Sequence, residues 1–157
     1  MELYPKIGGM WMRRGEQVKI ITPGRNKRIN VFITLLYPLR EIKWNVFERR
    51  RSREFIRHIR ELIYLIKKKG MKEIVLIMDN ASQHKSKETE EFIKRRREIK
   101  PLFLPKYAPQ LNEVEKINRK IKREINTNSS YKNKKELTDV TRAYLRRLSI
   151  LYKWDLT

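Results

Sequence analysis

Residues 73–84 read EIVLIMDNASQH, and this stretch decides the predicted fold class. Five apolar residues, IVLIM, follow one another without a break, which is typical of a central strand covered on both faces in an α/β sheet. The strand ends on Asp79, and Asn80 and His84 come shortly after it. Sites in open α/β sheets form at the carboxyl ends of the parallel strands. We therefore expect Asp79 to lie in a functional site.

Each of these polar residues also has an ordinary structural interpretation. An aspartate after a strand commonly forms a turn or caps the next helix, and Asn80 allows the same interpretation. His84 taken alone can simply bond a nearby backbone group. The functional interpretation of these residues therefore depends on a second stretch of the sequence.

The segments on either side of this strand predict further strands and helices. Short runs of β-branched and apolar residues predict strands over 17–22, 28–36, 42–47, 73–78 and 100–104. Apolar residues at helical spacing predict helices between Ser52 and Gly70 and over 86–97, 112–125 and 134–148. We expect Ser52 to cap the first helix, Gly70 to close it, and the second and third strands to form a hairpin. This order predicts a mixed sheet with helices packed on it.

The charge balance of the chain indicates an anionic partner. The 157 residues predict one domain, and 39 Lys and Arg against 18 Asp and Glu give a net charge of +21. DNA or another nucleic acid is the partner that such a charge favours, because phosphate contacts release counterions. An anionic membrane surface is the weaker alternative, since it rests on charge alone.

Other bulk features exclude several classes of protein. The chain has no cysteine, which excludes disulfides and thiol chemistry and leaves His and carboxylates as metal ligands. No apolar run reaches the length of a membrane span, and the N-terminus shows no signal peptide. We therefore expect a cytoplasmic protein without a membrane partner, associated with the nucleoid if its source is prokaryotic.

The second informative stretch is residues 104–115, which read LPKYAPQLNEVE. A strand ends here, two prolines stiffen the turn, and a helix begins. Asn112 is an ordinary N-cap residue, and Glu113 and Glu115 favour a helix N-terminus through the helix dipole. The same arrangement also places a rigid carboxylate beside the end of a sheet. One helix, one strand and one loop separate Glu115 from Asp79, so the two carboxylates can return to one place.

Taken together, the two stretches resemble the DDE transposases of the IS630/Tc1/mariner superfamily. Asp79, Asn80 and His84 match the family pattern D-N-x-x-x-H. The family pattern L-P-x-Y-S-P-x-L-N-P-x-E is matched by Leu104, Pro105, Tyr107, Ala108, Pro109, Leu111, Asn112 and Glu115. The departures are Ala108 where Ser is common, Glu113 where Pro is common, and Asn118 where an aromatic residue is common. Upstream, Trp11, Gly15 and the stretch TPGRNKRINVF are also similar to the family.

The resemblance implies an RNase H-like fold and a metal-dependent reaction on DNA. Asp79 and Glu115 would be catalytic and would hold two Mg²⁺ (or Mn²⁺) ions that activate water or a 3′-hydroxyl. The resemblance gives Asn80, His84 and Asn112 supporting or DNA-facing positions. Basic side chains would hold DNA phosphates, and the candidates are Lys27, Lys85, Lys116 and Arg119.

The family also has a first catalytic Asp, on a strand just before the segment matched by Glu2 to Pro5. That strand, its Asp and the upstream helix-turn-helix domain have no counterpart in this sequence. We therefore expect residues 1–157 to form a single catalytic domain truncated at its N-terminus, with impaired catalysis. Glu2 is a poor substitute ligand, because it lies past the strand position. We also expect exposed strand edges, covered by residues 17–22 or by a second copy in a homodimer.

Three functions remain open from the sequence. The leading hypothesis is a transposase catalytic-domain fragment that cleaves and transfers DNA strands, with catalysis impaired. The alternative is a catalytically inactive, basic DNA-binding or regulatory module derived from a transposase. A different RNase H-like nuclease, such as a resolvase, is the third, and residues 104–115 argue against it.

Overall fold

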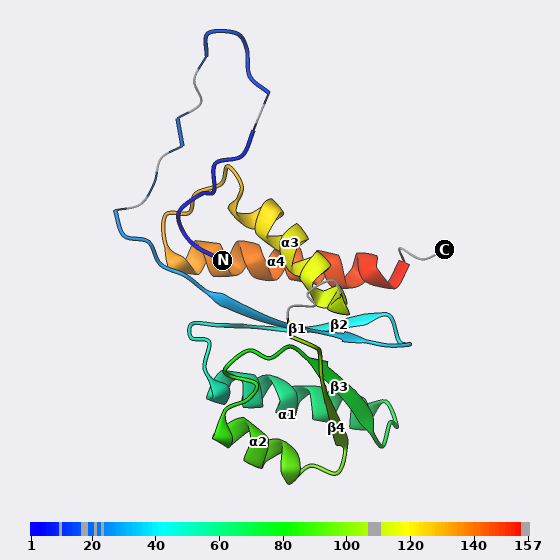
Figure 1. Ribbon diagram of the computed structural model, residues 1–157. Helices are drawn as coiled ribbons and strands as arrows, with labels where there is room; N and C mark the ends of the chain where they lie inside the picture. The colour runs from blue at the N-terminus through cyan, green and yellow to red at the C-terminus, as the bar shows by residue number, and fades with distance from the viewer. Residues whose placement is uncertain (10, 17–18, 21, 23, 107–110, 155–157) are drawn as a thin grey trace.

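The computed structural model describes residues 1–157 except 10, 17–18, 21, 23, 107–110 and 155–157 (Figure 1). In chain order, its elements are β1 (Asn30–Leu36), β2 (Glu41–Phe47), α1 (Ser52–Lys68), β3 (Ile74–Met78), α2 (Lys87–Lys94), β4 (Ile99–Phe103), α3 (Glu113–Asn126) and α4 (Lys134–Trp154). All four predicted helices are confirmed, and α4 continues past its predicted end at residue 148. No strand forms at Lys19, Ile20 or Thr22, and the rest of the weak strand predicted over 17–22 lies outside the described residues.

The strands form two small sheets. β1 and β2 pair as the predicted antiparallel hairpin, from Asn30 opposite Phe47 to Leu36 opposite Glu41. β3 and β4 pair in parallel, from Ile74 opposite Ile99 onward. The described residues therefore contain both antiparallel and parallel pairing, as the predicted mixed sheet does, but in two separate two-stranded sheets. The sequence analysis expected this sheet to lack its first strand. The physical reason is that no described strand bridges the hairpin and the parallel pair.

Helices cover the two faces of the hairpin, with α1 and α2 on one side and α3 and α4 on the other (Figure 1). Side-chain alternation along β1 explains this arrangement. Phe32 and Leu36 belong to a core with residues of α1, β3, α2 and β4. Val31, Ile33 and Leu35 point to the other face and pack against a second core, which contains residues of α3 and α4.

The sequence analysis predicted a capping residue for each end of α1. Gly70 closes the helix as predicted: it has a φ of +76°, its N–H bonds the carbonyl of Lys67, and the N–H of Met71 bonds the carbonyl of Ile66. The prediction for the start is wrong, because the N-cap is Arg51 and Ser52 is already helical. Arg51 makes no side-chain capping bond.

The covering of β3 differs from the prediction. Leu76 and Met78 are buried against α1, but Val75 and Ile77 are 61% and 58% exposed. The sequence predicted cover on both faces, and the described residues cover one. The reason is that α3 and α4 pack on the hairpin, α3 on β1 and α4 on β2. Within the part of the chain that the structure describes, no helix is both long and apolar enough to cross a membrane.

Candidate metal and DNA site at the end of β3

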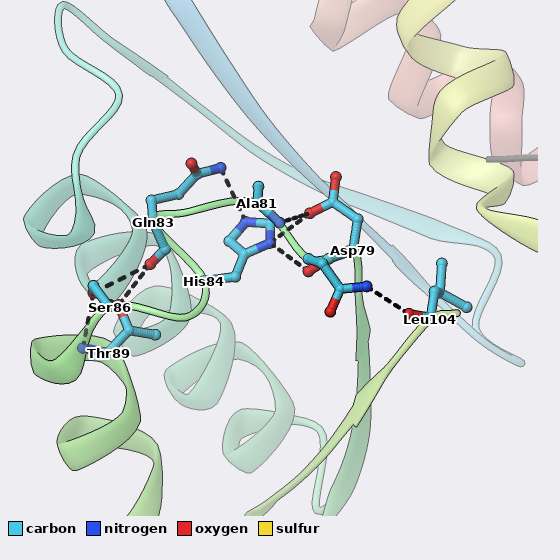
Figure 2. Close-up of polar contacts among 8 residues, drawn as sticks. Asp79, Ala81, Gln83, His84, Ser86, Thr89 and Leu104 are labelled. Carbon is cyan, nitrogen blue, oxygen red and sulfur yellow. Dashed lines mark hydrogen bonds and ion pairs between the residues drawn. The ribbon is translucent and has the colours of Figure 1, made fainter. Parts of the chain in front are cut away.

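Asp79 follows the last residue of β3, and the loop behind it holds its carboxylate. Its Oδ1 accepts a hydrogen bond from the Ala81 N–H at 3.1 Å and lies 2.8 Å from His84 Nδ1, as Figure 2 shows. No hydrogen bond from the described residues reaches Oδ2, and the side chain is 43% exposed. One carboxylate oxygen is therefore fixed by the protein, and the other is open to a ligand.

The loop holds His84 from several directions. Its Nδ1 also lies 3.2 Å from the Asp79 carbonyl oxygen, and its ring lies 4.3 Å from the ring of Phe55 on α1. The loop then continues into α2, where Ser86 accepts from the Thr89 N–H as the N-cap. The side chain of His84 is 14% exposed, so it acts here as a rigid support for Asp79.

Asn80 joins the two stretches that the sequence analysis singled out. Its Nδ2 donates to the carbonyl oxygen of Leu104 at 2.7 Å, and the N–H of Leu104 donates to the carbonyl of Met78 at 2.8 Å. These bonds hold the carboxyl ends of β3 and β4 together. Asn80 therefore has a supporting role in this structure.

The second carboxylate arrives at the first turn of α3. Asn112 caps this helix, because its Oδ1 accepts from the Val114 N–H at 3.2 Å. Glu115 lies in the first turn and is half-buried. A pocket of about 250 Å³ is lined by Asp79, His84, Asn112 and Glu115 together. The structure therefore gathers four of the predicted site residues, although they come from two separate regions of the chain.

The pocket is also lined by polar residues that the sequence analysis did not assign to the site, among them Arg50, Gln83, Asn118 and Lys122. Asn118 and Lys122 follow Glu115 by one and two helical turns, so helical spacing could have identified them. Gln83 lies inside the quoted stretch. With its amide oxygen turned toward Arg50, it accepts from Arg50 Nε at 3.1 Å and Nη2 at 3.0 Å.

The four predicted DNA-binding cations do not line this pocket. Lys116 is paired with Glu113 at 2.9 Å, one helical turn away. Lys85 lies over the ring of Phe103, with Nζ 5.2 Å from the ring centroid. Lys27 and Arg119 are exposed.

The carboxylates of Asp79 and Glu115 give the pocket oxygen donors that suit a divalent cation. Amide side chains line the same pocket, and among them the Oδ1 of Asn112 already accepts from the Val114 N–H. Mg²⁺ commonly binds one or two protein carboxylates, and water and substrate phosphates complete its octahedron. No group of three His, Asp or Glu side chains suited to a metal occurs among the described residues. Glu2 is engaged with Arg28 and does not line the pocket.

Comparison with known proteins identifies the family. A family model for the DDE superfamily endonuclease matches residues 1–138. The chain belongs to this family. The insertion element IS630 uncharacterized 39 kDa protein of Shigella sonnei is 31% identical over 117 residues, which is 74% of this chain and 34% of that protein. The matched residues therefore span about one third of that relative.

Two solved structures show the fold of the DDE domain. The Mos1 transposase paired-end complex with left transposon end has a TM-score of 0.67 at 11% identity, covering 98% of this chain and 47% of that chain. The Mos1 strand transfer complex has a TM-score of 0.62 at 10% identity, covering 94% of this chain and 43% of that chain. The RNase H-like fold is thereby confirmed, and so is membership of the IS630/Tc1/mariner superfamily.

Proposed function

We propose that this DDE domain acts in DNA transposition, by metal-dependent cleavage and transfer of DNA strands. The observation that carries the proposal is the shared pocket of Asp79 and Glu115. Sequence motifs alone could leave these carboxylates far apart, whereas the fold gathers them with His84 and Asn112. Members of this family generally use a divalent metal ion, and Mg²⁺ or Mn²⁺ matches the oxygen donors.

The residues of the pocket have distinct roles in this proposal. Asp79 would hold the metal through its carboxylate, whose Oδ1 is kept in place by His84 and the Ala81 N–H. Glu115 supplies the second carboxylate from a capped helix. A bound Mg²⁺ would act as a Lewis acid on a DNA phosphate and favour deprotonation of water or a 3′-hydroxyl. Arg50 and Lys122 would contact that phosphate, since both line the pocket.

DNA is the proposed partner, supported by charge and by the relatives. The net charge is +21, and a chain with this charge favours polyanions. The first of the two Mos1 structures is a paired-end complex with a transposon end. By analogy, we extend DNA binding to this chain, with Lys27, Lys85 and Arg119 as candidate phosphate contacts. A homodimer is part of the proposal, and sedimentation velocity on the protein with and without DNA tests it.

A second candidate function is a DNA-binding or regulatory module without catalysis. The observation that favours it is the small ligand set, since Asp79 and Glu115 are the carboxylates that line the pocket among the described residues. Two carboxylates bind a cation more weakly than three and leave more of its coordination to the substrate. Under this alternative, DNA binding persists and strand cleavage is lost.

Metal binding by calorimetry is the experiment that tests the proposed site. We expect Mn²⁺ binding to the wild type, and Asp79→Asn or Glu115→Gln should weaken it at least roughly tenfold, the loss that removing supporting groups alone commonly causes. Glu91→Gln is the matched control, because Glu91 is an exposed carboxylate on α2 outside the pocket. Binding that is unchanged in both site variants would contradict the proposal.

Cleavage of a labelled DNA duplex then separates the two functions. Mn²⁺-dependent nicking by the wild type, lost in Asp79→Asn, supports the transposase function. DNA binding without nicking, unaffected by Asp79→Asn, supports the regulatory module.

A further inference from the structure

Gln83 is a buried polar residue beside the two carboxylates, and the proposed chemistry does not use it. Its side chain is 7% exposed, and its amide lies 3.3 Å from Nε2 of His84 (Figure 2). Its backbone is fixed separately, because its carbonyl accepts hydrogen bonds from the hydroxyls of Ser86 and Thr89. A buried amide needs hydrogen-bond partners, and Arg50 supplies two of them.

Gln83 holds one edge of the Arg50 guanidinium. A guanidinium has only N–H donors, so the amide turns its oxygen toward Arg50 and accepts from Nε at 3.1 Å and from Nη2 at 3.0 Å. These two N–H groups point from the same edge of the planar group. The edge formed by Nη1 and the second N–H of Nη2 is left for another acceptor. Two parallel N–H groups of this kind bind the oxygen atoms of a phosphate bidentately.

The position of Arg50 determines which acceptor can reach that edge. Arg50 lines the same pocket as Asp79 and Glu115. None of the ion pairs among the described residues involves Arg50. Its charge is therefore available to an anionic group that enters the pocket, in contrast to Lys116, which Glu113 neutralises.

Arg50 differs in this respect from the arginines around it. Arg49, Arg51 and Arg53 are exposed as well, but they do not line the pocket. A basic run by itself gives no reason for one member to be held at the site. The contact with buried Gln83 gives that reason, because it fixes the direction of a long side chain.

We propose that Gln83 is a positioning residue, which holds Arg50 at the pocket so that the free edge of its guanidinium binds a DNA phosphate. The proposal rests on the proposed function, since the phosphate belongs to the DNA that the carboxylates would act on. Gln83 does not touch the phosphate in this proposal. It orders the arginine before DNA arrives, and ordering such a side chain on binding would otherwise weaken affinity roughly threefold to tenfold.

A double-mutant cycle on DNA binding by the full chain tests the proposal. Gln83→Met keeps the length of the side chain and the backbone bonds but removes the acceptor. Affinity for a labelled DNA duplex, measured without metal, should therefore fall roughly threefold to tenfold. In an Arg50→Ala background the same substitution should change affinity by less than about twofold, because no guanidinium remains to be positioned. An equal loss in both backgrounds would overturn the proposal, since a purely structural effect does not depend on Arg50.

Arg49→Ala provides the matched background for this cycle. It removes a neighbouring positive charge that does not line the pocket, so the full effect of Gln83→Met should persist there. Disappearance of the effect in this background too would overturn the proposal, because it would show a response to net charge rather than to Arg50. Circular dichroism verifies that all variants are folded.

A spectroscopic measurement tests the contact in the protein without DNA. In nitrogen-15 NMR spectra, the Nε–H of Arg50 is assigned by its absence from Arg50→Ala. It should exchange with water more slowly than the Nε–H of Arg49, and Gln83→Met should remove this difference. Equal exchange of the two arginines in the wild type would overturn the proposal.

Failure of this proposal can be told apart from failure of the proposed function. Neither the cycle nor the exchange measurement depends on metal binding or strand cleavage. Coupling between Gln83 and Arg50 in a protein that does not bind Mn²⁺ would support the role of Gln83 and contradict the metal site. Mn²⁺ binding and nicking without this coupling would overturn the role of Gln83 alone.

Discussion

At the scale of single residues, His58 is the centre of a polar network that crosses the core. Asn45 Nδ2 donates to Glu61 at 2.8 Å, so its Oδ1 faces His58 Nδ1 at 2.6 Å as an acceptor. His58 Nδ1 therefore carries the proton, and Nε2 is left to accept from the Thr34 hydroxyl at 2.9 Å. Lys43 pairs with the same Glu61. The network joins the hairpin to α1 and is satisfied when the imidazole is neutral.

This network predicts a dependence of stability on pH. Burial, with a smaller effect of Lys43, lowers the pKa of His58 from 6.5 to about 4. As pH falls, the unfolded chain takes up this proton before the folded chain does. The contribution of His58 is therefore complete above the unfolded pKa and is lost as pH falls to the folded value, by at most about 3 kcal/mol.

Urea unfolding at about pH 7.5 and about pH 4.5 measures this contribution. The wild type should lose more free energy of unfolding across this interval than His58→Gln, which has no imidazole to titrate. Carboxylates titrate in both proteins and cancel in the comparison. Equal losses in the two proteins would show that His58 is not the cause.

At the scale of the elements, strand and helix positions were predictable from the sequence because periodicity is a local property. The covering of β3 was not predictable. The apolar run IVLIM indicates that both faces of the strand need cover, but it does not indicate which helix provides it. The N-cap of α1 was missed because Ser52 is a strong capping residue one position inside the observed helix. Side-chain capping is only a preference, so the backbone around a serine can begin the helix one residue earlier.

The closing turn of α1 provides a test at this scale. Gly70 has a φ of +76°, a conformation that costs a residue with a Cβ about 1 kcal/mol. Gly70→Ala should therefore lower the free energy of unfolding by that amount. Gly24→Ala is the matched control: an added Cβ meets no atom within 4 Å there, and φ lies outside the left-handed range. Thermal unfolding of both variants measures the difference, and equal midpoints would show that this turn is not strained.

At the scale of the whole molecule, the sequence predicted the site residues that belong to recognisable motifs and missed the others. Asp79 and Glu115 belong to two quoted stretches, and the fold places both in one pocket. Arg50 comes from a basic run with no such pattern. Lys116 was predicted to hold phosphate, but in the structure it pairs with Glu113. This pairing was not predicted because the sequence does not show which anion lies nearer to the lysine.

Charge at this scale predicts a strong salt dependence of DNA binding. The logarithm of the association constant should fall linearly with the logarithm of salt concentration, by about 0.9 per phosphate contact. Arg50→Ala should reduce this slope by about one contact. Lys116→Ala should change it less, because Glu113 already neutralises that charge. Binding titrations at several salt concentrations measure the slopes, and a smaller effect of Arg50→Ala than of Lys116→Ala would contradict this ranking.

Met1 and Ile29 exchange two backbone hydrogen bonds of 2.8 Å, and this pairing has a consequence for how the protein is handled. Any residues fused ahead of Met1 leave the chain beside the start of β1, next to the pocket that Asp79 and Glu115 line. A tethered sequence has a high effective concentration at a nearby site, commonly in the millimolar range for short flexible linkers. A purification tag or cleavage remnant fused there would therefore compete with any free ligand of this pocket. A tag beyond the end of α4 avoids this competition.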